Sequence, residues 1–336
     1  MAAANLDVAG IGNAIVDVIS HANEAFLAAE GLAKGAMTLI DAARADQLYG
    51  RMGPGIESSG GSAGNTMAGI ASLGGSGAYI GKVRDDALGE IYRHDIQAMG
   101  IQFDTPAATK GPGTARCLVL VTPDGQRTMG TYLGACVDLG PEDIDPRIVA
   151  AAQITYLEGY LFDPPRAKAA FRRAAAVAHA ADRMVSLSLS DPFCVDRHRA
   201  EFRDLVASDI DILFANESEI CSLYETEHFD TAAAAVRDHV KIAVLTRSEK
   251  GSVLIADGAA HTVPAAPVAR VADTTGAGDL YASGVLFGLT RGLPLPTCGA
   301  IGSLCAAEII SHVGARPEAR LDQLVASAGL VPPGLM

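Results

Sequence analysis

The sequence predicts an α/β protein, with a doubly wound, mostly parallel sheet that carries helices on both faces and a small second sheet beside it. Three observations predict this fold. From Gln153 onward, short apolar strands alternate with helical segments. Four β-rich segments before residue 134 can form a separate sheet, and a glycine-rich loop enters a helix at residues 276–279. Alternating strands and helices are typical of a parallel sheet covered on both faces.

The first strand, Asp7 to Gly12, ends in Gly10-Ile11-Gly12. A dinucleotide-binding loop would need a third glycine and a following helix, whereas residues 14–19 continue as a β-rich run. We therefore expect the chain to cross here from one sheet to the other, with Asn13 and Asp17 on the rim. The alternative for Asp17 is a solvated turn residue.

A helix is expected from Asp41 to Met52, and a glycine-rich stretch, residues 58–65, enters a second helix. A further strand, Ala78 to Val83, follows. Strands at 115–121 and 126–133 are joined by the turn Thr122-Pro123-Asp124-Gly125. With residues 15–19 and 37–40, this hairpin is expected to form the small sheet.

The second half of the chain supplies most of the large sheet. Its predicted strands are Ile154 to Leu157, Met184 to Leu189, Ile210 to Phe214, Ile242 to Thr246 and Ser252 to Ala256. Its predicted helices are Pro165 to Ala181, Arg197 to Ala207, Glu217 to Tyr224, Thr231 to His239, a helix ending at Leu289, and Thr297 to Ile310. Ligands gather at the carboxyl ends of such strands. Tyr160, Phe162, Asn216, Glu219 and Thr246 lie there.

Composition and charge narrow the classes of partner. The chain has 336 residues, 49% of them hydrophobic, and a formal charge of −13. This charge argues against nucleic acid or an anionic membrane as the main partner. The six cysteines show no metal-ligand spacing, and the amino terminus shows no signal peptide, so a cytoplasmic protein with free thiols is expected.

The loop from Asp273 to Asp279 is the strongest candidate for chemistry. The first N–H groups of a helix lack partners within the helix, and the helix dipole adds positive potential there. An anion can therefore sit on the amides of Gly276, Ala277 and Gly278, beside the Asp279 carboxylate. An oxyanion hole with an adjacent base is suited to phosphoryl transfer to an alcohol. The plainer alternative is a tight turn with Asp279 as a dipole partner.

Two other patterns also have two interpretations. Asn216 and Glu219 lie three residues apart on one helical face, fit to order water around Mg²⁺. Without that role, Asn216 would be a helix cap and Glu219 a surface residue. Arg127 follows the hairpin turn, where one interpretation is an exposed cation and the other, given below, depends on a family resemblance.

Five blocks occur in the order typical of one known family: residues 10–17, 60–65, 79–89, 216–219 and 273–279. The string Asp-Thr-Thr-Gly-Ala-Gly-Asp at 273–279 closely resembles the carboxy-terminal signature of the ribokinase-like (PfkB) family of sugar and nucleoside kinases. Ser62 and the run from Ser188 to Phe193 resemble its adenosine-kinase branch. Ser248 stands where the family often has glycine.

The resemblance implies roles for individual residues. Asp279 would be the base, and Arg127 and the amides of residues 276–278 would stabilise the moving phosphoryl group. The implied substrate-binding residues are Asn13, Asp17, Gly60, Gly61, Ser62, Asn65, Tyr160 and Phe162. The implied ATP-binding residues are Asn216, Thr246, Arg247, Gly251, Ala306 and Ile310, although the last two are also suited to plain core. Asn216 and Glu219 would contact Mg²⁺ through water, and the resemblance leaves room for a monovalent cation such as K⁺.

The resemblance also implies two units and an activity. Residues 1–13, 54–108 and 135–336 would form the large nucleotide-binding domain, and residues 14–53 and 109–134 a lid. The expected activity is ATP-dependent phosphorylation of adenosine to AMP. The alternatives are a kinase for ribose, fructose or a related sugar, and a non-catalytic nucleoside-binding protein. The expected partners are the small substrate and ATP, with monomer and homodimer both open.

Overall fold

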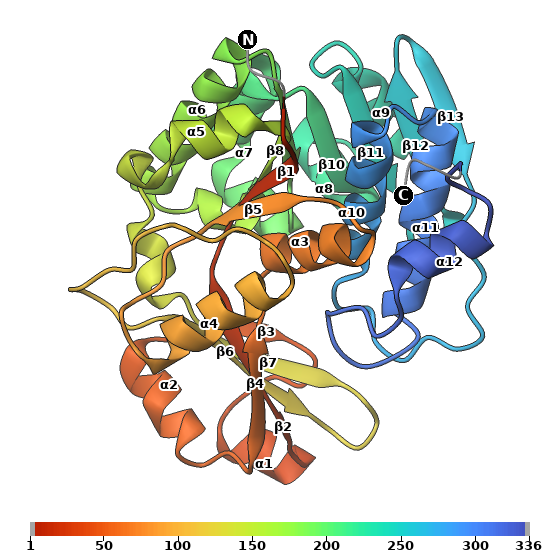
Figure 1. Ribbon diagram of the computed structural model, residues 1–336. Coiled ribbons are helices and arrows are strands. Elements are labelled where there is room, and N and C mark those ends of the chain that lie inside the picture. Colours follow the sequence, from red (N-terminus) through yellow and green to blue (C-terminus); the bar gives the residue numbers. More distant parts are fainter. Residues whose placement is uncertain (1–3, 333–336) are drawn as a thin grey trace.

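The computed structural model describes residues 4–332 and contains two sheets of very different size (Figure 1). The large sheet has eight strands in the order β13-β12-β11-β10-β9-β8-β1-β5. Their bounds are β1 Leu6–Ile11, β5 Gly77–Ile80, β8 Ala152–Glu158, β9 Met184–Ser188, β10 Ile212–Asn216, β11 Ile242–Thr246, β12 Ser252–Ala256 and β13 Ala259–Val263. The six neighbouring strands β11, β10, β9, β8, β1 and β5 run parallel. Strands β12 and β13 are antiparallel additions at one edge. The predicted fold class is confirmed.

Helices cover both faces of the large sheet. The helices are α1 Glu24–Ala29, α2 Ala42–Tyr49, α3 Ser62–Ser72, α4 Ala87–Ala98, α5 Pro146–Ala151, α6 Pro165–Ala180, α7 Pro192–Asp209, α8 Glu217–Tyr224, α9 Phe229–Val236, α10 Ala277–Thr290, α11 Leu295–Ile309 and α12 Leu321–Ser327. Alternate residues of β1 enter opposite cores: Ala9 and Ile11 pack in the core beneath α5 to α9, and Val8 packs in the core beneath α3, α10 and α11. This alternation follows from the two-residue repeat of a strand. Among the described residues, no helix is long and apolar enough to cross a membrane.

The small sheet has five strands in the order β3-β7-β6-β2-β4. They are β2 Ile15–His21, β3 Met37–Leu39, β4 Gly55–Ser59, β6 Ala115–Val121 and β7 Arg127–Tyr132. The predicted crossing after Gly12 is present, since β1 lies in the large sheet and β2 in the small one. The sequence analysis missed β4: residues 55–59 pair with β2, although we had placed them with the large unit.

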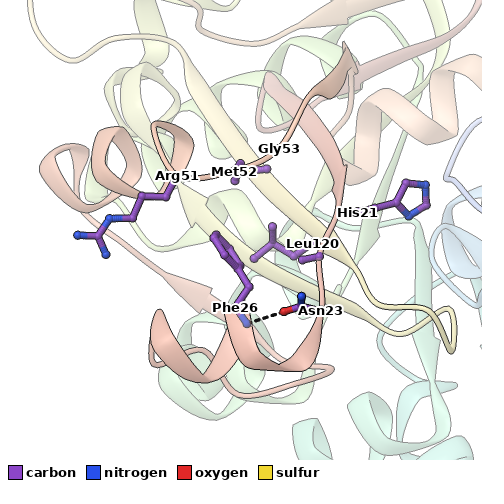
Figure 2. Close-up of a pocket in the computed structure, with 8 residues that line it drawn as sticks. His21, Asn23, Phe26, Arg51, Met52, Gly53 and Leu120 are labelled. Carbon is purple, nitrogen blue, oxygen red and sulfur yellow. Dashed lines mark hydrogen bonds between the residues drawn. The ribbon is translucent and has the colours of Figure 1, made fainter.

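The two faces of the small sheet differ. Val18, Leu118 and Leu120 point to one side, where they form a buried cluster with Leu27 of α1 and Leu48 of α2. The alternate residues of the same strands point to the other side. A cavity of about 360 Å³ lies on the helix-covered side, and His21, Phe26 and Arg51 are among the residues that line it (Figure 2). None of the predicted site residues lines it.

Candidate active site

The start of α10 presents free amides. Gly276 has a φ of +80° and caps the helix without a side-chain hydrogen bond. The amide of Ala277 donates to the Thr274 carbonyl at 3.2 Å, whereas those of Gly276, Gly278 and Asp279 have no acceptor within residues 4–332. A Cβ on Gly278 would meet nothing within 4 Å, so the approach to these amides is open. An anion can therefore bind main-chain N–H groups at this point.

Asp279 lies beside these amides and is held by two donors. Its Oδ1 accepts from the Ser62 hydroxyl at 2.6 Å, and its Oδ2 accepts from Asn65 Nδ2 at 2.9 Å. Burial raises the pKa of Asp279 above its ordinary value, and the bonds from Ser62 and Asn65 oppose this rise. Both donors come from the start of α3, so two helix N-termini meet at this carboxylate. Asn65 Oδ1 is buried without a partner and remains able to accept a hydrogen bond.

Asp17 of β2 lies against the glycine-rich loop. A Cβ on Gly60 would come within 2.5 Å of its carboxylate, so only glycine fits there. No donor among residues 4–332 hydrogen-bonds this carboxylate. Burial raises the pKa of Asp17 to about 6, against the opposing charges of Arg316 and Arg127, while Asp279 adds to the rise. The group can accept hydrogen bonds from a ligand.

Asn13 is bound to a buried glutamate that the sequence analysis did not single out. Glu158, at the end of β8, accepts from Asn13 Nδ2 at 2.6 Å and from the Ala63 amide at 2.8 Å. It is 1% exposed, and burial raises its pKa to about 7. Gly61 has a φ of +81°, and a Cβ there would come within 2.2 Å of the Asn13 carbonyl. Asn13, Glu158 and the loop at 60–63 therefore form one rigid unit.

Arg127 connects the small sheet to the α10 loop. Its Nη1 lies 3.2 Å from Asp273 Oδ2, and both side chains are 7% exposed. The Nε of Arg127 is buried without a partner. Asp273 also accepts from the Thr275 amide at 2.9 Å and from the Gly314 amide at 3.1 Å. The arginine that we expected at the phosphate is thus placed at the edge of the same loop.

The two loop aromatics have separate positions. Phe162 is 1% exposed and stacks on Phe202 with ring centroids 4.4 Å apart, next to Phe171. The prediction that Phe162 contacts the substrate is therefore wrong, because its ring lies in the core between α6 and α7. Tyr160 is 38% exposed, and its amide donates to the Ser190 hydroxyl. Tyr160 alone of the pair is accessible to a ligand.

Asn216 and Glu219 form a capping box at the start of α8. The Glu219 amide donates to Asn216 Oδ1 at 2.8 Å, and the Asn216 amide donates to Glu219 Oε2 at 2.9 Å. Glu219 is buried rather than on the surface, and burial, with the charges of Asp191 and Asp279, raises its pKa to about 7. A buried carboxylate that lies near two other negative charges fits a bound cation. Among the described residues, no three His, Cys, Asp or Glu side chains could hold a metal ion directly, so Mg²⁺ would need phosphate and water ligands.

The predicted ATP-binding residues other than Asn216 lie around the β11–β12 loop and α11. The Arg247 guanidinium pairs with Glu217 at 3.0 Å and lies 3.9 Å from the centre of the Phe229 ring. Its amide donates to the Gly251 carbonyl at 2.7 Å, which closes the loop that follows Thr246. Ser248 has a φ of +51°, a conformation more usual for glycine. Ser248 therefore adopts a left-handed backbone conformation, which glycine would adopt at lower cost.

Ala306 and Ile310 are partly buried against the core beneath α10 and α11. The Ile310 carbonyl accepts from the Ala272 amide at 2.8 Å, which ties the end of α11 to the loop before α10. Both side chains are therefore part of the packing, and their accessible portions are what an adenine could contact.

Comparison with known proteins identifies the family. The model of the pfkB family of carbohydrate kinases matches residues 37–320. The chain belongs to the pfkB family. A pfkB kinase is an ATP-dependent phosphotransferase, so the amides at 276–278 and the carboxylate of Asp279 lie in a kinase fold.

Individual relatives of this pfkB kinase have different substrates in their names. Adenosine kinase from Saccharomyces cerevisiae is 26% identical over 332 residues, which cover 90% of this chain and 94% of that protein. The ATP-dependent ribose-1-phosphate kinase of Halopiger xanaduensis is 28% identical over 270 residues, 80% of this chain and 86% of that protein. The adenosine kinase structure from Sinorhizobium meliloti is 52% identical, with a TM-score of 0.90 and coverage of 97% and 100%. A probable sugar kinase from Rhizobium etli is 50% identical, with a TM-score of 0.91 and coverage of 98% and 100%.

The sequence analysis of this pfkB kinase missed three residues of the site. Asp273 was quoted in the motif but given no role, and Glu158 and Arg316 were not considered. A charged residue at the end of an apolar strand, 152–158, could have indicated Glu158. Nothing in the local sequence indicates Arg316, which lies in the loop after α11 and reaches the site only through the fold.

Proposed function

We propose that this kinase transfers the γ-phosphoryl group of ATP to the 5′-hydroxyl of a nucleoside, with adenosine as the expected substrate and AMP as the product. The observation that carries the proposal is an apolar sheet face that lies over the candidate site. A free sugar carries hydroxyl groups around its whole ring, whereas a nucleoside has at one end an aromatic base with two flat faces.

The face is defined by strand register. Asp17 pairs with Ser58 and Cys117, Ile19 pairs with Ile56 and Val119, and Val119 pairs with Met129. Paired residues in adjacent strands point to the same side of a sheet. The side that carries Asp17 and Arg127 is therefore mostly apolar, with Ile15, Ile19, Met37, Leu39, Ile56, Cys117, Val119, Val121 and Met129 on it. Its other polar members are His21, Ser58 and Thr131.

This face turns towards the site and is partly open. Arg127 belongs to it and reaches Asp273 in the loop before α10. Ile56 is 74% exposed and Leu39 is 51% exposed, on the side opposite α1 and α2. Exposed apolar residues gathered on one face favour contact with an apolar partner. A nucleobase beneath this sheet would cover them, and Tyr160 could add a stacking surface.

The polar end of the site suits a ribose. Asp17 has no donor from the protein and can accept from two hydroxyl groups, and the free Oδ1 of Asn65 can accept from a third. The 5′-hydroxyl would then point towards Asp279, which takes its proton as the oxygen attacks phosphorus. The free amides of Gly276 and Gly278, with Arg127, would stabilise the developing charge.

The nucleotide would lie on the carboxyl-end side of β10 and β11, near Thr246, Gly251 and α11. Mg²⁺ bound with ATP would neutralise phosphate charge, and Asn216 and Glu219 would hold its water ligands. The small sheet would act as a lid that keeps water from the phosphoryl group. The division into a large domain and this lid is part of the proposal, with residues 55–59 reassigned to the lid.

A substrate panel tests the proposal. Adenosine, inosine, guanosine, ribose and fructose are each incubated with ATP and Mg²⁺, and ADP formation is measured. We expect adenosine to give the highest kcat/KM. A higher kcat/KM with ribose or fructose would instead support a sugar kinase, the function named for several relatives.

A non-catalytic nucleoside-binding protein predicts a different result. Titration calorimetry would then show tight adenosine binding with no ADP formed from any member of the panel. The two donors that hold Asp279 argue for catalysis, because a binding protein has no need of an oriented base beside free amides.

A further inference from the structure

We propose that Arg316 is a positioning residue: its guanidinium holds the glycine-rich loop at 59–64 in place and supplies the positive charge shared by Asp17 and Asp279. The inference rests on the proposed function, since it assigns a role within the same site. Arg316 lies in the loop between α11 and α12, far in sequence from all the residues that it serves.

The guanidinium spans the glycine-rich loop. Its Nη2 donates to the Ser59 carbonyl at 2.8 Å and to the Ser59 hydroxyl at 3.1 Å, and its Nε donates to the same carbonyl at 3.1 Å. Its Nη1 donates to the Gly64 carbonyl on the other side of the loop. Two carbonyls at the ends of a six-residue stretch need a planar group with several donors, which arginine has and lysine lacks.

The spanned loop touches three acidic groups of the site. Gly60 lies against the Asp17 carboxylate, the Ser62 hydroxyl donates to Asp279, and the Ala63 amide donates to Glu158. A displacement of the loop would therefore change the surroundings of all three carboxylates at once. Substrate affinity should depend on it, because the ribose contacts lie between Asp17 and this loop.

The loop also rests on a cluster of three aromatic rings. The rings of Tyr79, Tyr92 and Phe103 lie with their centroids 5.7 Å apart in each pair, and Tyr92 donates to the Gly60 carbonyl at 3.5 Å. A Cβ on Gly64 would lie 3.0 Å from the Tyr92 hydroxyl and 3.4 Å from Arg316 Nη2, so both groups hold the same part of the loop. The aromatic rings carry no charge, so the positive charge at the loop comes from Arg316.

Charged and titratable groups approach Asp17 from four elements: Arg316 after α11, Arg127 on β7, Asp279 on α10 and the Cys117 thiol on β6. Arg316 is the strongest charge that opposes the effect of burial on the pKa of Asp17, and it also lowers the pKa of Asp279. Removal of this charge should raise both values. Asp17 would then be protonated at a higher pH and would no longer accept two hydroxyl groups.

Three variants separate charge from geometry. Arg316→Gln keeps hydrogen-bond donors and removes the charge, so the acid limb of the pH profile of kcat/KM for adenosine should move to higher pH. Arg316→Lys keeps the charge but cannot span both carbonyls, so the acid limb should stay while the KM for adenosine rises about tenfold. Arg320→Gln is the control, because Arg320 is exposed and pairs with Asp322; its profile should match the wild type.

An acid limb that stays in place in Arg316→Gln would overturn the charge role. Equal rises of the KM for adenosine and the KM for ATP in Arg316→Lys would overturn the positioning role. Failure of the proposed function looks different, since the wild-type protein would then phosphorylate no nucleoside in the panel. In that case, NMR titration of ¹³C-labelled aspartate still tests the inference: the pKa of Asp17 should be higher in Arg316→Gln than in the wild type, and an unchanged value would overturn it.

Discussion

Asp279 and Asp17 face the same site from two regions of the molecule, and the protein holds them in opposite ways. Asp279, in the first turn of α10, accepts from Ser62 and Asn65, both on α3. Asp17, on β2 of the small sheet, lies against Gly60 and accepts no hydrogen bond within residues 4–332. Burial raises the pKa of both groups.

The difference indicates different tasks. A base must be aimed before the reaction, and fixed donors from a packed helix supply this aim without reorganisation. A carboxylate that binds a diol must instead leave its lone pairs free until the ligand arrives. The region built on the large sheet is therefore complete without substrate, whereas the region on the small sheet is completed by it.

Asp279→Asn is expected to have the largest effect, because it removes the base and keeps the shape of the side chain. We expect kcat to fall by between about 10² and 10⁴. Thermal unfolding and calorimetric binding of adenosine should change little. Turnover within a few-fold of the wild type would remove Asp279 from its role and erase the contrast with Asp17.

Arg127→Met tests the residue that joins the two regions. Arg127 belongs to the small sheet, yet it ends on Asp273 beside the amides of α10. Loss of a donor to the transferring phosphoryl group should lower kcat by roughly 10²-fold. Steady-state kinetics measure this effect. The control is Arg116→Met, because Arg116 also lies on the small sheet but pairs with Asp46 of α2. An unchanged kcat would leave Arg127 as a structural ion pair.

The sequence predicted the large sheet more fully than the small one. Residues 242–246 and 252–256 were placed correctly because continuous apolar runs bounded by polar loops leave one interpretation. Strand β4, with the sequence Gly-Ile-Glu-Ser-Ser, has little apolar content and was missed. Its pairing with β2 depends on contacts between distant segments, which a single sequence does not display.

The site shows the same limit. The segment from Asp273 to Asp279 was found because a helix start and its glycines are local features. Phe162 was misplaced because its partners, Phe171 and Phe202, are set by how α6 and α7 pack. Arg316 was missed for a similar reason, since its hydrogen bonds reach residues more than 250 positions away.

Asp17→Ala is expected to act on substrate binding alone. Without the carboxylate, two ribose hydroxyls lose a charged acceptor, so the KM for adenosine should rise at least about tenfold. The KM for ATP should stay the same. Glu57→Ala removes an exposed carboxylate from β4 of the same sheet and serves as the control. Equal rises in both KM values would show that Asp17 supports the fold rather than the diol.

Glu219→Gln should have the smallest effect, on the pH dependence of stability. The folded-state pKa of Glu219 is raised from 4.5 to about 7, so the folded protein binds this proton more tightly than the unfolded chain. The resulting stability is complete below pH 4.5 and is lost as pH rises through about 7. Glu158, also raised to about 7, and Asp17, raised to about 6, share this sign. Partly exposed carboxylates with a lowered pKa, such as Glu217, have the opposite sign: their stabilisation is present above pH 4.5 and is lost only as pH falls below that value.

The melting temperature of the ligand-free protein, measured from pH 4.5 to 8, should therefore fall as pH rises. Glutamine keeps the capping box with Asn216 but does not titrate. In Glu219→Gln, the total fall in melting temperature between pH 4.5 and 8 should therefore be smaller by roughly 2 °C. Glu217→Gln, on the same first turn of α8, should leave the slope unchanged. An identical slope in Glu219→Gln would mean that Glu219 is ionised throughout.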